Sequence, residues 1–356
     1  MMTTEHDRLT ENDRPAGRDR SAAGSQAVGP AKMRAIVQHR YGIAPQDVLH
    51  QEQIAVPVIK DNEVLVRVRA AGADRGTWHL MTGMPYLMRI AGFGMRGPKT
   101  PVPGMDVAGT VEAVGQDVTD LRPGQEVFGT CAGSFAEFAR ARASRLAPKP
   151  ASLTFEQAAA VPVSATTALQ AVRDAARVRS GQRVLVIGAS GGVGSFAVQI
   201  AVAAGAEVTG VCSAEKADLV RAIGAEQVID YNTEDPVDGR RHYDVILDIG
   251  GGRPVARLRR ALVPHGTLVI TGEDGGRWLG PIPRNLRALL LSPWVNHRLT
   301  AFVARQNHDD LMELTGLIEA GAITPAVDRV YPLAEAAAAL RHLADGRARG
   351  KVVLTI

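Results

Sequence analysis

Cysteine is scarce in this chain of 356 residues, and no apolar run approaches the length of a membrane span. The two cysteines, Cys131 and Cys212, are too few for a four-cysteine zinc lobe and give no disulfide framework of the secreted type. A membrane-spanning helix needs roughly 18 apolar residues in a row. The formal net charge is 41 − 37 = +4, too small and too dispersed to indicate nucleic-acid binding. We therefore expect a soluble, cytoplasmic protein with reduced thiols.

Large apolar side chains are also nearly missing from the first 31 residues, which mix arginines with acidic residues. Such a segment cannot offset its ordering entropy by burial, so residues 1–31 are expected to form a disordered tail. The segment has neither the apolar core of a signal peptide nor the acid-poor composition of an organelle transit peptide.

Short strand-like segments follow from Met33 onward. Met33–His39 and Glu63–Ala70 alternate apolar and polar residues, as half-buried strands do. Turns rich in glycine and proline, such as Pro101–Gly104 and Arg122–Gly124, separate the segments. Further strands are predicted at Val107–Val114, Glu126–Phe128 and Ser134–Ala139. The pattern predicts a compact β-barrel-like domain of roughly 120 residues.

The pattern changes near Phe155, where strands and helices begin to alternate. Arg183–Ile187 is typical of a buried strand, and Ser195–Ala204 is typical of a helix. Such alternation predicts an α/β fold with a doubly wound parallel sheet of the Rossmann type. Further strands are predicted at Glu207–Cys212, Gln227–Asp230, Tyr243–Asp248 and Thr267–Thr271, and further helices at Ala217–Ile223 and Val255–Leu262.

A glycine-rich loop joins the first of these strands to the helix that follows. It reads Gly188, Ala189, Ser190, Gly191, Gly192, Val193 and Gly194. Glycines let the chain turn tightly and let a pyrophosphate approach the backbone and the helix N-terminus. A G-x-x-G-x-x-G string alone is weak evidence, and a purely structural turn is the alternative. Because the string stands between a predicted strand and a predicted helix, we interpret it as a dinucleotide-binding loop.

The end of the next strand bears on the choice of cofactor. An NAD site usually carries an acid there to hold the ribose hydroxyls, whereas this chain reads Cys212, Ser213, Ala214, Glu215, Lys216. Ser213 can donate to a 2′-phosphate and Lys216 can neutralise it. Glu215 is expected to point away at the start of the following helix, and a solvated Lys216 is the alternative. We predict NADPH as the cofactor and include Tyr231 in its site.

These motifs resemble the medium-chain dehydrogenase/reductase superfamily, and within it the zinc-free quinone oxidoreductase branch related to zeta-crystallin. The resemblance extends from Met33 to Ile356, and its markers are Pro103–Gly109, Pro123–Val127, Ala159–Ala168 and the glycine loop followed by Gln199. Val202 departs from the branch, which usually has a basic residue or Ser there. The resemblance implies a GroES-like substrate domain of residues 32–157 and 303–356 around a Rossmann domain of residues 158–302. Helix Leu333–Leu343 and strand Lys351–Thr355 then return to the first domain.

The resemblance also allows a residue-by-residue test for zinc. Where zinc-dependent relatives place a Cys ligand, this chain reads Ala71, Gly72, Ala73, Asp74. Where they carry Gly-His-Glu, it has Gly104, Met105 and Asp106. A thioether and a lone carboxylate cannot replace imidazole and thiolate in a tetrahedral site, so we expect no metal.

Without a metal, the resemblance implies that hydrogen bonds polarise a substrate carbonyl while NADPH delivers hydride. It places Asp74–Trp78 beside the nicotinamide, and many relatives have Asn at the position of Asp74. Asp74 donates only when it is protonated, so the alternatives are that it orients Arg75 or a water, or caps the following helix. Thr77 and Tyr86 are alternative hydroxyl donors. Thr167 matches a position that contacts the nicotinamide amide, unless its hydroxyl bonds back to its own helix.

Two segments are expected to shape the substrate pocket. Leu80–Met95 is rich in Met and aromatic residues, which suit an adaptable apolar lining. Arg277–Gln306 holds several arginines, two tryptophans and no acidic residue. We interpret it as lying near the pocket or a subunit interface, with contact to an anionic membrane surface as the less favoured alternative. We expect a homodimer.

The leading interpretation is an NADPH-dependent oxidoreductase that reduces a small electrophile, a quinone or an α,β-unsaturated carbonyl. One alternative is a zinc-free alcohol or aldehyde dehydrogenase. The other is a non-catalytic NADPH-binding sensor or accessory protein, which the uncertain proton donor, Asp74, supports. No nucleic-acid partner is expected, because no basic stripe interleaved with aromatic residues occurs outside residues 277–306.

Overall fold

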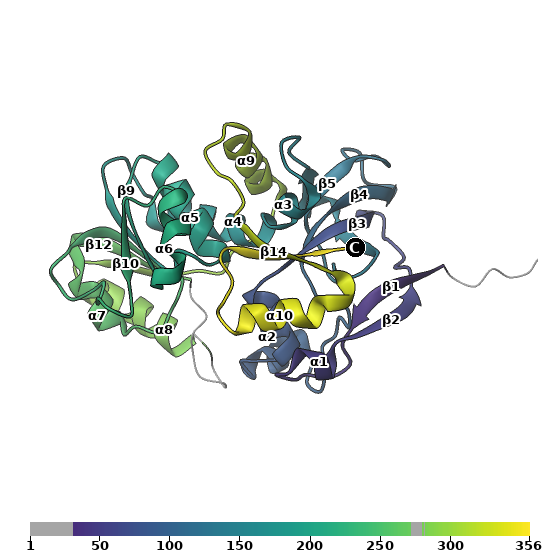
Figure 1. Ribbon diagram of the computed structural model, residues 1–356, viewed down its shortest axis with the longest axis horizontal. Helices are drawn as coiled ribbons and strands as arrows, with labels where there is room; N and C mark the ends of the chain where they lie inside the picture. Colours follow the sequence, from purple (N-terminus) through teal and green to yellow (C-terminus); the bar gives the residue numbers. More distant parts are fainter. Residues whose placement is uncertain (1–30, 272–279, 281) are drawn as a thin grey trace, which may run out of the picture. The chain divides into compact units, whose positions relative to one another are not determined.

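The computed structural model describes residues 31–271, 280 and 282–356. Lys32–Ile356 form one compact unit, which Figure 1 traces from purple to yellow. The tail predicted over residues 1–31 lies outside the described residues, apart from residue 31. Arg277 and Trp278 of the predicted basic segment also lie outside them. In the described part of the chain, no helix is long and apolar enough to cross a membrane.

Six parallel strands form one sheet, in the order β10-β9-β8-β11-β12-β13. In its central strand β8, Arg183–Ile187, the four residues after Arg183 are buried, because helices cover both faces of the sheet. The Rossmann-type sheet predicted from the sequence is confirmed. The other strands are β9 (Glu207–Cys212), β10 (Gln227–Asp230), β11 (Tyr243–Asp248), β12 (Leu262–Ile270) and β13 (Arg298–Ala301).

Helix α5, Gly192–Ala203, begins within the glycine loop and is buried over most of its length. It packs against helix α4, Pro162–Leu169, and against β8 and β9. The remaining helical segments near this sheet are η3 (Gln170–Ala176), η4 (Ala214–Lys216), α6 (Ala217–Ala222), α7 (Val255–Arg260), α8 (Ile282–Leu291), η5 (Ser292–Trp294) and α9 (His308–Glu319).

A second sheet has seven strands, in the order β14-β15-β3-β4-β5-β7, with β6 paired to β3. The central strand β3, Glu63–Ala73, buries Val64, Val66 and Val68 on one face, as its alternation predicts. Its other strands are β4 (Asp106–Val114), β5 (Glu126–Thr130), β6 (Phe138–Arg142), β7 (Leu146–Pro148), β14 (Val327–Pro332) and β15 (Lys351–Thr355). Strands β1 (Lys32–Val37) and β2 (His50–Ala55) pair separately.

The C-terminal strand joins this second sheet. Strand β15 pairs antiparallel with β3 and parallel with β14, and helix α10, Ala336–Ala344, packs against both β15 and β3. Figure 1 shows the yellow C-terminal elements beside the purple and blue N-terminal strands. The C-terminal strand therefore lies in the same sheet as β3 and β4. The shorter helical segments here are α1 (Pro45–Val48), α2 (Arg75–Thr82), η1 (Arg89–Phe93), η2 (Ala143–Arg145), α3 (Phe155–Ala159) and η6 (Leu333–Glu335).

One predicted strand is misplaced. Ser134–Ala139 was expected to be a strand, but β6 begins at Phe138. The residues before it bond to two different neighbours: Phe135 accepts from the N–H of Ile36 and donates to the carbonyl of Pro103. Ser134, Phe135 and Ala136 are all buried, because this stretch crosses between two segments and does not run along one strand ladder. The strand β2 was missed because its residues, HQEQIA, are mostly polar and none is fully buried.

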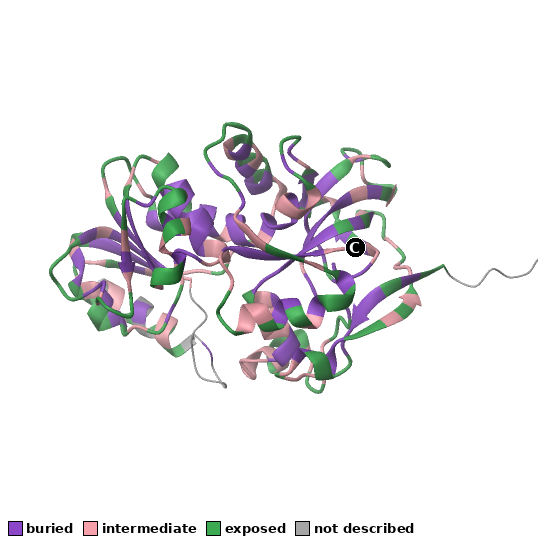
Figure 2. Cartoon of the chain, viewed as in Figure 1, coloured by how far each residue is buried: buried purple, intermediate pink, exposed green. Residues whose placement is uncertain are grey.

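Buried residues concentrate in the strands and in the helices between them, shown in purple in Figure 2. One apolar cluster is continuous between the two sheets. It runs from Phe128 in β5 through Leu169 in α4 to Phe196 in α5 and Val186 in β8. This shared core fixes the glycine loop relative to the second sheet.

Candidate functional site

A pocket of about 300 Å³ lies at the carboxyl ends of β8 to β11. Ligands of open parallel sheets bind at this edge, where the strand order reverses, and the order here reverses between β8 and β11. Five predicted residues line the pocket: Gly188, Ser190, Ser213, Lys216 and Tyr231. These five residues therefore lie together at this edge, and the geometry of each residue decides what it can bind.

Two positions of the glycine loop have no room for a side chain, whereas a third position has room. Gly188 has φ = +87°, and a Cβ there would lie 2.8 Å from the backbone nitrogen of Gly250. A Cβ on Gly194 would overlap the carbonyl oxygen of Gly188. At Gly191, the N-cap of α5, a Cβ would come no closer than 3.4 Å to the nearest described atom. Gly188 and Gly194 are required by the turn, whereas the surroundings of Gly191 leave room for a ligand.

This loop fits the pyrophosphate of a dinucleotide. The first N–H groups of α5 lack partners within the helix, and the helix dipole favours an anion at that end. Ala189 and Ser190 are buried within the turn, and Val193 is half-buried on the first turn of α5. The loop therefore offers its backbone N–H groups, and not these side chains, to a bound pyrophosphate.

Ser213 and Glu215 lie closer together than the sequence indicates. The Ser213 hydroxyl donates to the Glu215 carboxylate across 3.3 Å. The expectation that Glu215 points away is therefore wrong, because the short segment η4 turns its carboxylate back toward Ser213. Glu215 itself is exposed, so water screens the charge of its carboxylate. The hydroxyl lines the pocket, and its hydrogen bond places the acid next to that lining.

Lys216 is buried and bonds to the C-terminal part of the chain. Only 8% of the residue is exposed, and its ammonium donates to the carbonyl oxygens of Gly346 and Ala348. An ammonium has three N–H donors, so one remains for a ligand. Two further contacts hold the same segment: Arg349 pairs with Asp218, and the N–H of Gly350 donates to the carbonyl of Ser190. The loop between α10 and β15 therefore supports Lys216 and the glycine loop from outside the pocket.

The sequence prediction missed six residues that line the pocket: Ile187, Val211 and Cys212 belong to the ends of β8 and β9, and the other three are Gly250, Gly251 and Arg253. The last three are the most informative. They follow β11, and the run of glycines directly after a predicted strand was an available signal. Asp248, the last residue of β11, accepts from the N–H of Gly251 and pairs with Arg284 of α8. Burial raises the pKa of Asp248, whereas the Arg284 guanidinium lowers it. The pair connects the glycine turn to α8, which places part of the predicted basic segment beside the pocket.

Asp74 is the N-cap of α2 and uses only one carboxylate oxygen. Its Oδ1 accepts from the backbone N–H of Thr77 at 2.7 Å and from the Thr77 hydroxyl at 2.9 Å. Its Oδ2 is buried and has no hydrogen-bond partner among the described residues. Thr77 is fully buried, and its hydroxyl proton is directed at Asp74. Thr77 therefore holds Asp74, while Oδ2 retains its hydrogen-bonding capacity.

Two other candidates have definite local contacts. The hydroxyl of Thr167 donates to the carbonyl of Val163, 2.7 Å away in its own helix, which was the alternative considered for it. The ring of Tyr86 is half-buried and lies under the guanidinium of Arg89, 4.7 Å from its centroid. Tyr86 belongs to the Met-rich segment that the sequence assigned to the substrate pocket.

Asp106 and Lys351 form an ion pair that the sequence prediction did not identify. The Lys351 ammonium lies 2.7 Å from Oδ2 of Asp106, and these side chains are 1% and 0% exposed. The ammonium also donates to the Ser164 hydroxyl, and Oδ1 of Asp106 accepts from the N–H of Val163. The stem of Lys351 lies against Gly192, where a Cβ would come 3.0 Å from its Cδ. The pair therefore connects β4, β15, α4 and the start of α5.

These contacts do not suit zinc. The carboxylate of Asp106 is already bonded to an ammonium and a backbone N–H, and its neighbour Met105 offers only a thioether. Within the described ranges, no group of three or more His, Cys, Asp or Glu side chains is arranged to hold a metal ion.

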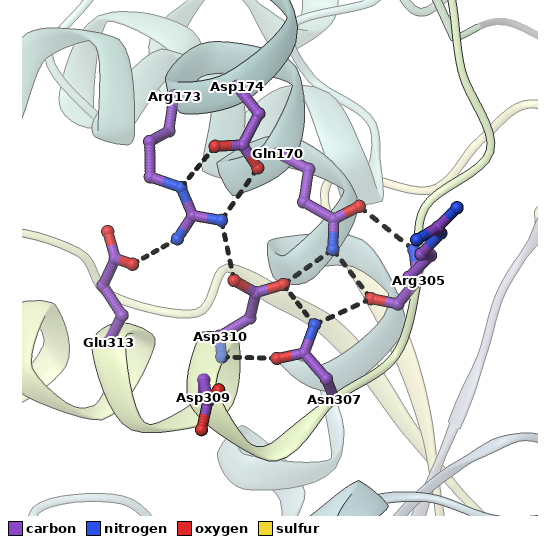
Figure 3. Close-up of a pocket in the computed structure, with 8 residues that line it drawn as sticks. All are labelled: Gln170, Arg173, Asp174, Arg305, Asn307, Asp309, Asp310 and Glu313. Carbon is purple, nitrogen blue, oxygen red and sulfur yellow. Dashed lines mark hydrogen bonds and ion pairs between the residues drawn. The ribbon is translucent and has the colours of Figure 1, made fainter.

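A second pocket, of about 440 Å³, lies between η3 and α9 (Figure 3). Arg173 bonds to Asp174, Asp310 and Glu313, and Gln170 donates to Asp310 and to the carbonyl of Arg305. Figure 3 shows these side chains turned toward one another. None of the predicted site residues lines this pocket, and its polar groups satisfy each other. We interpret it as a structural connection that holds α9 against η3.

The open position of the loop leads to a prediction. Gly191→Val should place a branched side chain where a pyrophosphate approaches the backbone, and NADPH binding measured by calorimetry should be lost. The loss of stability should be only about 1 kcal/mol, because Gly191 has an extended conformation that valine accepts and only its N-cap preference is forfeited.

The control is Gly194→Val, whose side chain would overlap Gly188. It should lower the melting temperature as well as abolish binding. Unchanged NADPH affinity in Gly191→Val would show that the loop is a structural turn only.

Comparisons with known proteins agree with this geometry. Residues 60–151 match the family description "Alcohol dehydrogenase GroES-like domain", and residues 223–354 match "Zinc-binding dehydrogenase". A mitochondrial NAD(P)H oxidoreductase from mouse is 32% identical, with 91% of this chain and 89% of that protein covered. Pig quinone oxidoreductase is 31% identical, with 93% and 100% covered.

Among solved structures, a mycobacterial protein complexed with NADPH superposes with a TM-score of 0.77 at 28% identity, covering 91% of this chain and 100% of that one. One family assignment follows from the fold, the glycine loop and the relatives that match over nearly their whole length. The chain belongs to the medium-chain dehydrogenase/reductase superfamily, as an NAD(P)H oxidoreductase related to the quinone oxidoreductases.

Proposed function

We propose that this protein is an NADPH-dependent, zinc-independent oxidoreductase that transfers hydride to a small electrophile, a quinone or an α,β-unsaturated carbonyl. The observation that carries the proposal is the pocket in which Ser213 and Lys216 lie beside the open glycine loop. The pig relative named as a quinone oxidoreductase supports the substrate class.

A reduced nicotinamide dinucleotide would supply the hydride, and the residues of the chain would hold and orient the reactants. The backbone around Gly191 would hold the pyrophosphate. Asp74 would receive the substrate through Oδ2, because Oδ1 is fixed by Thr77. As a carboxylic acid it would donate to a substrate oxygen, and as a carboxylate it would accept from a water that donates. Tyr86 remains the alternative hydroxyl donor.

The preference for NADPH rests on the charges at the pocket rim. Lys216 has one N–H left for a 2′-phosphate, the Ser213 hydroxyl is adjacent, and Tyr231 lines the same pocket. Glu215 opposes the preference, since its carboxylate would repel the phosphate and could hold a ribose hydroxyl of NADH instead. We give greater weight to Lys216 because its ammonium is buried whereas the Glu215 carboxylate is exposed. A buried charge interacts more strongly with a bound phosphate than an exposed charge, which water screens. The mycobacterial neighbour solved with NADPH supports the same choice.

We also propose a cytoplasmic homodimer that binds no nucleic acid. Strand β13 is the edge of the parallel sheet in the part of the chain described. Beside it, α8 and η5 expose Leu286, Leu290 and Trp294, and a second copy would cover such apolar side chains.

Leu290→Glu should give monomers by sedimentation equilibrium where the unaltered protein is dimeric. Val58→Glu, at a position that is even more exposed than Leu290 and distant in sequence from this edge, should leave the dimer intact.

Steady-state NADPH oxidation against quinones, enones and aldehydes, in the presence of EDTA, tests the reaction. Quinones or enones should be turned over, and chelation should not reduce the rate, because no residue of the site depends on a metal. Turnover of alcohols with NADP⁺ alone would instead identify an alcohol dehydrogenase. Stoichiometric NADPH binding without turnover of any electrophile would identify a non-catalytic binder, and stoichiometric zinc would refute zinc independence.

Lys216→Ala tests the cofactor preference. A charge-assisted hydrogen bond contributes about 1.5–3 kcal/mol, so kcat/KM for NADPH should fall about 10- to 150-fold while that for NADH barely changes. Glu215→Gln should have the opposite effect and raise kcat/KM for NADPH, because it removes a repulsive charge.

Arg349→Ala is the matched control for this experiment. Arg349→Ala breaks the contact of the C-terminal loop with Asp218, and Lys216→Ala breaks the contact of the same loop with the Lys216 ammonium. Unlike Lys216→Ala, Arg349→Ala removes no group that lines the pocket. Both cofactors should be used as before. Equal losses for NADPH and NADH in Lys216→Ala would mean that Lys216 acts on the loop alone, and a preference of the unaltered enzyme for NADH would refute the cofactor assignment.

A further inference from the structure

The segment that follows α2 exposes three large apolar side chains within six residues. Ile90 is 71% exposed, Met95 is 67% exposed and Phe93 is 46% exposed. The short helical segment η1, which contains two of them, has no buried residue. Large apolar side chains scattered singly over a surface need no explanation, but a group of them marks an interaction site. We call Ile90, Phe93 and Met95 the apolar tip.

Hydrogen bonds hold the backbone of this segment in place. The Tyr41 hydroxyl lies 3.1 Å from the carbonyl oxygen of Phe93 and 2.9 Å from that of Gly94. The N–H of Lys99 donates to the same carbonyl of Phe93. Arg89 donates to two carbonyl oxygens at the end of α2, and its guanidinium lies over the Tyr41 ring, 4.3 Å from the centroid. These contacts use the polar groups of the segment and leave the apolar tip to solvent.

The apolar tip projects from the surface and lines neither of the pockets described above. Gly92, between Ile90 and Phe93, has φ = +116°, and a Cβ there would meet no described atom within 4 Å. A projecting turn does not offer a groove for a peptide or a small ligand. Its side chains can instead enter a soft apolar layer, which needs no shape complementarity.

Positive charge accompanies the apolar tip. The run from Arg75 to Met105 contains no Asp or Glu. Arg96 and Lys99, which directly follow the tip, are both exposed, and neither has an ion-pair partner in the part of the chain that the structure describes. Their charges are therefore available to a negatively charged partner.

The neighbouring segment adds a further cation and few acids. A Cβ on Gly97 would overlap the carbonyl oxygen of His39, so residues 39–41 pack directly against the segment. Arg40 is exposed and donates to the backbone carbonyl of Asp47. The carboxylate of Glu52 is paired with the His39 ring, 2.9 Å away. Three exposed cations thus stand against the exposed Asp47 and one acid that already has a partner.

We propose that the apolar tip docks on an anionic lipid bilayer. Ile90, Phe93 and Met95 enter the boundary between headgroups and acyl chains, while Arg96 and Lys99 bind the headgroups. A bilayer offers an apolar layer directly beneath a negatively charged one, which matches the order of apolar and basic side chains here. This surface is distinct from the exposed side chains of α8 and η5 that the proposed dimer covers, and its docking does not depend on the cofactor or the substrate.

Flotation of the full chain with vesicles tests the proposal. The protein should float with phosphatidylcholine vesicles that contain phosphatidylserine and not with pure phosphatidylcholine vesicles, and high salt should release it. Ile90→Glu/Met95→Glu should lower the partition coefficient about 10-fold or more, because two apolar side chains no longer leave water. Arg96→Gln/Lys99→Gln should lower it by about 5-fold for each cation removed.

Val58→Glu is the matched control, because Val58 is 83% exposed and lies away from the tip. Residues 39–41 follow the end of the β1–β2 ladder at Val37 and His50, whereas Val58 follows the opposite end at Lys32 and Ala55. This variant should float like the unaltered protein. All variants should keep the melting temperature, since only exposed side chains change. Residues 1–30 are the same in every variant, so they cannot cause a difference between them.

A fluorescent label on Met95→Cys gives a second readout. Cys131 and Cys212 are buried, so an environment-sensitive thiol label should react with the new cysteine. Its emission should shift to the blue with anionic vesicles and be quenched by lipids brominated on their acyl chains, whereas the label on Val58→Cys should show neither effect.

Absent flotation, equal flotation with uncharged vesicles, or flotation that the tip variants leave unchanged would overturn the proposal. Self-association of the protein that Ile90→Glu/Met95→Glu abolishes, without any binding to vesicles, would also overturn it and identify the tip as a contact between copies.

Discussion

The buried ion pair between Lys351 and Asp106 is the contact on which the arrangement of the site depends. It joins the last strand of the chain to β4, and its stem and hydrogen bonds reach α4 and the start of α5. Removing one partner from such a pair typically costs about 3–5 kcal/mol, because the other charge is left buried and unpaired. Replacing both can be neutral, so the pair need not be retained for stability. We infer that its role is to fix the second sheet, α4 and the glycine loop relative to one another.

The nucleotide site is accordingly built from distant parts of the chain. The glycine loop supplies the backbone, and the turn after β9 supplies Ser213 and Lys216. The loop before β15 supports Lys216 and Ser190 through Gly346, Ala348 and Gly350. Lys216 is therefore both a candidate phosphate ligand and a support for the C-terminal loop. The same ammonium therefore joins the lining of the pocket to the loop before the last strand.

Much of this could be predicted from the sequence because it depends on local patterns. The run Arg183–Ile187 and the glycine string after it identify a strand, a turn and a helix without knowledge of any other segment. The contacts that were missed are not local. Lys351 and Asp106 are far apart in the sequence, and the strand order β15-β3-β4 brings them together. Lys216 and Gly346 are also far apart in the sequence, and they meet only in the folded chain. The orientation of Glu215 also escaped prediction, because one short turn decides it.

The central claim is that NADPH held at the glycine loop passes hydride directly to an electrophile without a metal. Single-turnover oxidation of NADPH deuterated at the nicotinamide C4, in metal-free buffer with a quinone or enone, tests it most directly. The account predicts that deuterium on one face of the ring slows the oxidation and that, with an enone, it appears in the product at carbon. Oxidation at an unchanged rate with no deuterium in the enone product, or bound NADPH that no electrophile oxidises, would contradict it.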